Sequence, residues 1–153
     1  MKFFIVLFLA ALAHSAWAAE PLPGKQVIER VDRLMRSLPR LSGEARKQAI
    51  SDLYDIEKSK EPGEADAVLY FGYDVTQNVD GTRTLTPKPD RNEVLSKAIP
   101  ALISAIDDAE GVNNKAWWIL IFLQTDCPPP QRAVWEAWWK KAGPTLFATK
   151  PDR

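Results

Sequence analysis

The chain has 153 residues, of which 46% are hydrophobic, and its 20 Lys and Arg balance its 20 Asp and Glu to a formal net charge of zero. A chain of this length can form one domain with a hydrophobic core. Its neutral balance argues against nucleic acid as the main partner, because neutralising phosphates needs a clustered basic excess.

The N-terminus has the pattern of a signal peptide. Lys2 precedes an apolar run over 3–13, and residues 16–18 give the small-x-small pattern that signal peptidase recognises. We predict residues 1–18 as the signal peptide and 19–153 as a single domain, periplasmic or secreted, with no membrane attachment after cleavage. The alternative is an uncleaved N-terminal anchor helix.

Cleavage would remove His14, the only histidine, and leave Cys127 as the only cysteine. A Ser-His-Asp or Cys-His catalytic site and the usual His or Cys zinc site are then excluded. We therefore predict a protein that is not an enzyme, with no cofactor and no metal. Cys127 is either a shielded side chain before three prolines or part of an intermolecular disulfide.

Two amphipathic helices are expected at the start of the mature chain. Apolar residues recur at helical spacing over 25–38, where Pro39 ends the helix, and again over 43–58, with Ser42 as the N-cap. The short connection predicts an antiparallel helical hairpin over 25–58.

The first of these helices carries a row of arginines opposite its apolar face: Arg30, Arg33, Arg36 and Arg40. Such a row could bind an anionic polymer or lipid headgroups. Because Glu29 and Asp32 dilute the positive charge, we interpret the row as a solvated face.

Residues 64–71 fit either a short helix or the start of a strand. After them, Asp80-Gly81 separates two Thr-containing arms, which is typical of a hairpin with a type I′ turn. We predict a small β-hairpin or extended loop over 72–90 that projects from a helical body. Projecting loops on rigid scaffolds often carry function, so Asp80 and Arg83 are candidate binding residues.

Asp90 and Glu93 predict a capping box at the start of a helix that contains Pro100, where we expect a kink. The following helix includes the unbroken apolar run 116–123. This run is too short to span a membrane, which takes about 20 residues, and it is apolar on every side. It should therefore be covered by other helices on more than one side.

The last predicted helix begins near Pro129 or Pro130 and ends at Gly143-Pro144. Apart from Trp17, every tryptophan lies between residues 117 and 139. Exposed tryptophans stack on sugar rings or anchor protein partners, whereas buried ones form the core. Trp138 and Trp139 are the candidates to stay accessible, and we take them as candidate binding residues.

Residues 90–143 resemble a HEAT-like helical repeat. The segment 98–108 is similar to its first helix, including the kinking proline, and 112–123 is similar to its second. The tryptophan-rich helix looks like one that closes many bacterial HEAT-like proteins. The resemblance implies a mainly helical fold of antiparallel hairpins of the HEAT-like αα-solenoid type, whose stacked repeats cover each other. It also implies binding of macromolecules rather than catalysis.

These features lead to two functional hypotheses. The first is an exported, non-catalytic binding or scaffold protein that engages a protein partner, with a periplasmic immunity or inhibitor protein as its specific form. The alternative is a cell-wall glycan-binding module or a carboxylate-dependent glycan hydrolase that uses exposed Trp and Asp side chains.

Overall fold

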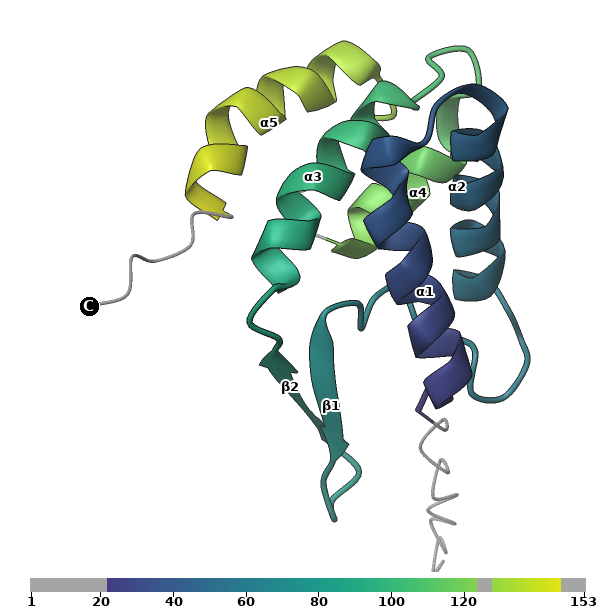
Figure 1. The fold of residues 1–153 in the computed structure, drawn as a ribbon, viewed down its shortest axis with the longest axis vertical. Helices are drawn as coiled ribbons and strands as arrows, with labels where there is room; N and C mark the ends of the chain where they lie inside the picture. The colour runs from purple at the N-terminus through teal and green to yellow at the C-terminus, as the bar shows by residue number, and fades with distance from the viewer. Residues whose placement is uncertain (1–21, 124–127, 147–153) are drawn as a thin grey trace, which may run out of the picture.

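The structure is a computed structural model that describes residues 22–123 and 128–146, and within these ranges the protein is mainly helical (Figure 1). The predicted signal peptide and Cys127 lie outside the described residues. The elements in chain order are α1 (Lys25–Ser37), the 3₁₀ helix η1 (Leu38–Arg40), α2 (Gly43–Glu57), β1 (Tyr73–Gln77), β2 (Arg83–Pro87), α3 (Arg91–Ser104), the 3₁₀ helix η2 (Gly111–Asn113), α4 (Lys115–Leu123) and α5 (Arg132–Leu146).

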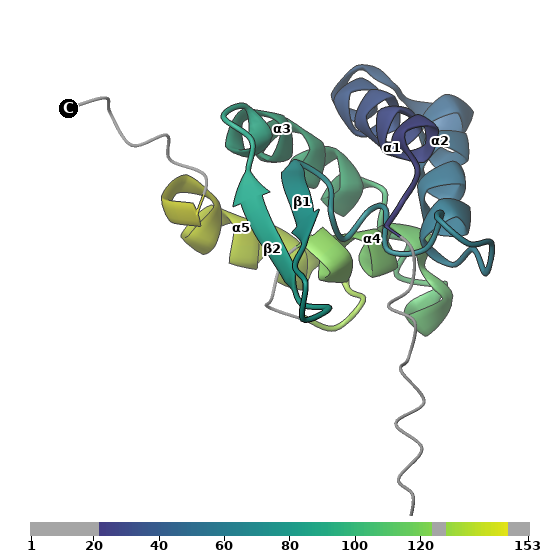
Figure 2. The same cartoon turned by 90° about the horizontal axis from the view of Figure 1, so that it is seen from below.

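The first four α-helices form two antiparallel pairs, as Figures 1 and 2 show. The first pair is α1 with α2, which confirms the predicted hairpin over 25–58, and the second pair is α3 with α4. The pairs lie against each other, with α1 beside α3 and α2 beside α4. Helix α5 packs on α3, on the side away from α2.

The apolar faces of all five α-helices meet in one core, to which the segment between α2 and β1 also contributes. Full burial of a Leu, Ile or Met side chain contributes about 1.5–3 kcal/mol each. The largest side chains that are fully buried are Val31, Met35, Leu38, Leu53, Val68, Leu95, Ile99, Leu102, Ile106, Ile119, Leu120 and Trp135.

Helix α4 is the apolar helix of the sequence, and its expected covering on more than one side is confirmed. It packs against both α2 and α3 and buries Ile119 and Leu120 completely. On its half-buried side, the ammonium group of Lys58 lies 4.7 Å from the ring centroid of Trp118 and 4.9 Å from that of Phe122. Within the described ranges, every helix is too short or too polar to cross a membrane.

Helix α5 does not end at Gly143-Pro144 as predicted but continues to Leu146. Gly143 lacks the positive φ of a terminating glycine. A Cβ atom at this position would lie 2.8 Å from the Trp139 ring, so close packing explains the glycine better than helix termination does. Pro144 lies in the last turn of α5, where its missing N–H breaks few of the helix's backbone hydrogen bonds.

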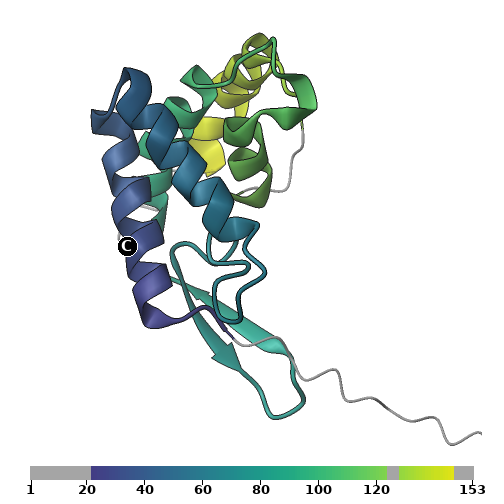
Figure 3. The same ribbon diagram turned by 90° about the vertical axis from the view of Figure 1, so that its right-hand side faces the viewer.

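The segment 62–72 is neither of the predicted alternatives, helix or strand; it is a series of turns that buries Ala67, Val68 and Phe71. It is followed by the predicted hairpin. Strands β1 and β2 pair antiparallel from Tyr73 with Pro87 to Gln77 with Arg83. Figure 3 shows the hairpin extending beyond the ends of the helices.

The predicted type I′ turn is wrong. Such a turn needs a positive φ at both central residues, and Gly81 has φ +84° whereas Asp80 has a negative φ. The N–H of Gly81 donates to the Asn78 carbonyl at 3.0 Å, and the N–H of Asn78 donates to the Thr82 carbonyl at 2.8 Å. The hairpin thus has a three-residue loop in which only the glycine is left-handed.

Candidate functional site

The β1–β2 hairpin is the most prominent projection of the described structure. Its outer face consists of two cross-strand pairs, Asp74 with Thr86 and Thr76 with Thr84, and all four side chains are exposed. At the tip, Val79 is fully exposed, and Leu85 on the inner face is 43% exposed. The hairpin therefore presents a polar strand face and an apolar tip.

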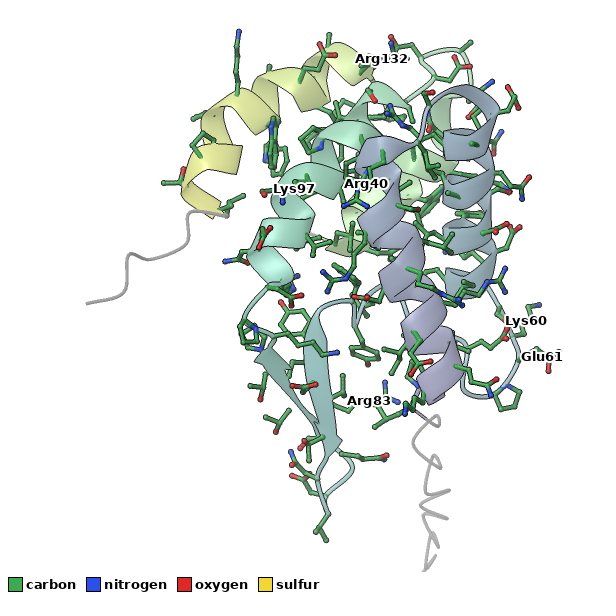
Figure 4. All side chains as sticks on the ribbon, viewed as in Figure 1. Arg40, Lys60, Glu61, Arg83, Lys97 and Arg132 are labelled. Atoms are coloured by element: carbon green, nitrogen blue, oxygen red, sulfur yellow. The ribbon has the colours of Figure 1, made fainter. Side chains whose placement is uncertain are left out.

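The inner side of the hairpin is held to segment 62–72 by Arg83. Its guanidinium donates a hydrogen bond to the Tyr70 hydroxyl and lies 3.9 Å from the Asp66 carboxylate. Only 20% of the Arg83 side chain is exposed. Figure 4 shows this side chain beside the helical body. The predicted binding residue Arg83 thus positions the hairpin.

The base of the hairpin is held by Arg91 at the start of α3. Its guanidinium carbon lies 4.2 Å from the centroid of the Tyr73 ring, and its Nε donates to the Phe71 carbonyl at 3.3 Å. Between these residues, Gly72 has φ +74°, and a Cβ atom there would lie 2.4 Å from the Cγ of Arg91. Arg91 therefore packs directly over the glycine backbone.

Asp80, another predicted binding residue, shapes the loop. Its carboxylate accepts hydrogen bonds from the Thr82 hydroxyl at 2.6 Å and the Thr82 N–H at 2.9 Å. These hydrogen bonds lower the pKa of Asp80, so its charge is well maintained. Asp80 and Arg83 share the hairpin, but their side chains bond to different partners.

Glu57 is the only charged residue that is buried among those described. Its carboxylate accepts the N–H groups of Val68 at 2.8 Å and Leu69 at 3.3 Å, which fastens segment 62–72 to the end of α2. Burial raises the pKa of Glu57. These contacts give the carboxylate a structural role under the hairpin.

The predicted binding residues Trp138 and Trp139 are half-buried and pack against the core. The ring centroid of Trp138 lies 5.3 Å from that of Trp135, in an edge-to-face arrangement, and 6.1 Å from that of Trp139. Trp135 itself is fully buried. The tryptophan stripe of α5 therefore runs from the core to its margin rather than along an open surface.

The arginine row of α1 and η1 is partly neutralised by Asp32 of α1 and by acids from other elements. Arg30 lies 3.7 Å from Asp52, and Arg36 contacts Asp32 at 2.7 Å and Asp90 at 2.5 Å. These hydrogen bonds raise the pKa of Arg36 and lower that of Asp90. The four arginines of the row look alike in the sequence, but in the structure Arg30 and Arg36 are paired with acidic side chains.

The residues that fasten the hairpin were not recognised from the sequence. Asp66, Tyr70 and Arg91 come from a segment of ambiguous pattern and from a helix start, and neither place carries a motif. In the described part of the chain, no three or more His, Cys, Asp or Glu side chains are grouped so that they could hold a metal ion.

Comparison with protein-family models, with curated proteins and with solved structures gives no match for this chain.

Proposed function

We propose that this is an exported, non-catalytic binding protein that engages a protein partner through the β1–β2 hairpin. An immunity or inhibitor protein, which blocks its target by inserting a projecting element, is the specific form we favour. The export signal is proposed from the N-terminal sequence pattern alone.

The observation that carries this proposal is a firmly anchored hairpin with an apolar tip. A two-stranded hairpin by itself is marginally stable in water. Here the contacts of Arg83 with Tyr70 and of Arg91 with Tyr73 hold it at two points. An element ordered before binding loses little conformational freedom on binding, which favours affinity. The exposed Val79 offers the kind of apolar contact that a partner's pocket would bury.

We also propose that the helical body is HEAT-like. In stacked repeats of that kind, first helices lie beside first helices and second helices beside second helices. The contacts of α1 with α3 and of α2 with α4 support this relationship, and α5 would then cover the end of the stack.

The proposed function is tested by affinity capture with three tagged forms of residues 19–153, using the exported proteins of the source cell. The forms are the unchanged protein, Val79→Asp at the hairpin tip, and Val112→Asp as a matched control. Val112 is also exposed, at 65%, but lies in the connection between α3 and α4, at the other end of the molecule (Figure 1).

We expect one protein to be captured in stoichiometric amount by the unchanged and Val112→Asp forms. Its affinity for Val79→Asp should fall roughly tenfold or more, as for a central interface residue. Equal capture by all three forms would rule out the hairpin as the binding element. Recovery of wall glycan in place of a protein would favour the glycan-binding alternative.

A further inference from the structure

A groove runs along α1 and the beginning of α3. It consists of two hollows, of about 190 and 490 Å³, which share Arg36 as a lining residue. The exposed apolar residues of its lining are Ile28, which is 37% exposed, and Pro39, whereas Val94 is a core residue of which only 8% is exposed. We call this feature the α1–α3 groove.

The acidic side chains of the α1–α3 groove already have cationic partners. Asp32 and Asp90 contact Arg36, as described above. Glu93 lies 2.7 Å from Lys97, and Glu29 lies 3.8 Å from Lys25. The acidic side chains of the groove are therefore already in ion pairs with cationic side chains of the same protein.

Two cations of the groove have no such partner. Arg33 lines the larger hollow and Arg40 the smaller one; both are exposed, and neither makes an ion pair with another described residue. Figure 4 shows Arg40 and Lys97 on the same face of the molecule. The unsatisfied charge of the groove is thus a pair of guanidinium groups.

The spacing of the two arginines is that of a helix face. Arg33 lies in α1 and Arg40 at the end of the 3₁₀ helix η1. The seven residues between them make close to two turns across both helices, so the two arginines lie on one side, separated by roughly 10–12 Å along the axis. Two carboxylates placed seven residues apart on a second helix are separated by about the same distance as the two arginines and lie on one side of that helix. Guanidinium groups bind carboxylates in a bidentate, charge-assisted manner.

We propose that the α1–α3 groove binds an acidic helix of a protein partner, with Arg33 and Arg40 each taking one carboxylate. Apolar side chains between these two carboxylates would cover the exposed Pro39, as in other helix-in-groove complexes. A polyanion or an anionic membrane fits less well, because the four carboxylates of the groove would repel a continuous negative charge.

This inference rests on the proposed function insofar as the partner is a protein. The groove and the hairpin adjoin, because the groove residue Lys88 directly follows β2. One partner can therefore contact both surfaces, but each surface is tested separately.

The test uses fluorescence anisotropy with residues 19–153 and two fluorescein-labelled, stapled helical peptides of identical composition. The first carries two Glu residues seven positions apart, with Leu between them on the same face. The second carries the Glu residues five positions apart, so that they point to nearly opposite sides. The protein variants are Arg33→Gln with Arg40→Gln and, as a control with the same charge change outside the groove, Lys60→Gln with Lys140→Gln.

We expect the first peptide to bind at least tenfold more tightly than the second, and more weakly as salt is raised. The arginine double variant should lose that preference, and the lysine double variant should keep it, with equal thermal unfolding showing that both are folded. Equal binding of the two peptides, no binding of either, or full binding by the arginine double variant would overturn the proposal. Val79→Asp should bind the first peptide normally, so a failed hairpin proposal and a failed groove proposal give different results.

Discussion

Arg36 in α1 and Asp90 before α3 are 54 residues apart in sequence, and their side chains meet at 2.5 Å. Asp90 stands at the N-cap position of α3, yet it makes no side-chain capping hydrogen bond, and Glu93 bonds to Lys97 instead. The predicted capping box is therefore wrong. A hydrogen bond between two charged groups is stronger than one to a neutral N–H. The Asp90 carboxylate therefore bonds to Arg36 rather than to a backbone N–H in the first turn of α3.

Replacing Asp90 with Asn should reduce the free energy of unfolding by about 0.2–1 kcal/mol at neutral pH, because both partners are nearly half exposed. Arg36 lowers the pKa of Asp90 in the folded protein. The stabilisation is therefore present above the ordinary Asp pKa of about 3.9 and is lost as the pH falls through the lowered value. Urea unfolding at several pH values should show the unfolding free energies of the native protein and of Asp90→Asn becoming equal at acidic pH. A difference that stays constant down to the lowest pH would contradict this interpretation.

Glu57 should respond differently to Ala and Gln. Glu57→Ala leaves the buried N–H of Val68 without its acceptor and should cost about 1–3 kcal/mol in unfolding free energy. Glu57→Gln keeps a carbonyl acceptor, and we expect it to be at least as stable as the native protein at pH 7. Both variants are compared by urea unfolding. If Glu57→Gln lost as much unfolding free energy as Glu57→Ala, the negative charge itself would be needed.

The pH dependence of the native protein provides a second test of Glu57. Its pKa is raised in the folded state, so its protonated form favours folding below the unfolded pKa of about 4.3. That contribution is lost as the pH rises through the raised folded pKa. Glu57→Gln should lack this part of the pH profile. An unchanged profile in the variant would exclude Glu57 as its source.

Gly72 and Gly81 form a matched pair for separating backbone strain from steric overlap. Both have a positive φ, of +74° and +84°, so Ala at either position carries a strain of about 1–2 kcal/mol. A Cβ at Gly72 would also lie 2.4 Å from Arg91, whereas a Cβ at Gly81 meets nothing within 4 Å. We expect Gly72→Ala to lower the unfolding free energy clearly more than Gly81→Ala. Equal losses would mean that Arg91 moves away at little cost.

Gly143→Ala should reverse the usual effect of this substitution. Inside a helix, Ala is normally about 1 kcal/mol more favourable than Gly. Here the new Cβ would lie 2.8 Å from the Trp139 ring, and we expect destabilisation together with a changed near-ultraviolet circular dichroism of the tryptophans. A more stable variant with an unchanged spectrum would show that Gly143 and the Trp139 ring are not in this contact.

Local patterns predicted the elements with good accuracy where one signal dominated. The periodicity over 25–38 and 43–58 predicted α1 and α2, and the Asp80-Gly81 pair predicted the hairpin, because helix periodicity and turn chemistry act over a few residues. Errors occurred where a local signal competed with distant packing. Gly143 reads as a helix stop, but its missing side chain makes room for Trp139.

Periodicity and turn residues were enough to predict a mainly helical protein, the place of its small hairpin and the apolar face of each helix. The partners of the polar side chains became known only from the folded arrangement. It placed Arg83 against Tyr70 and Arg36 against Asp90, and left Arg33 and Arg40 unpaired among the described residues. This difference arises because burial of apolar groups is non-directional and is encoded in local periodicity. A hydrogen bond or an ion pair needs two particular groups in contact, and for distant residues only the folded chain brings them together.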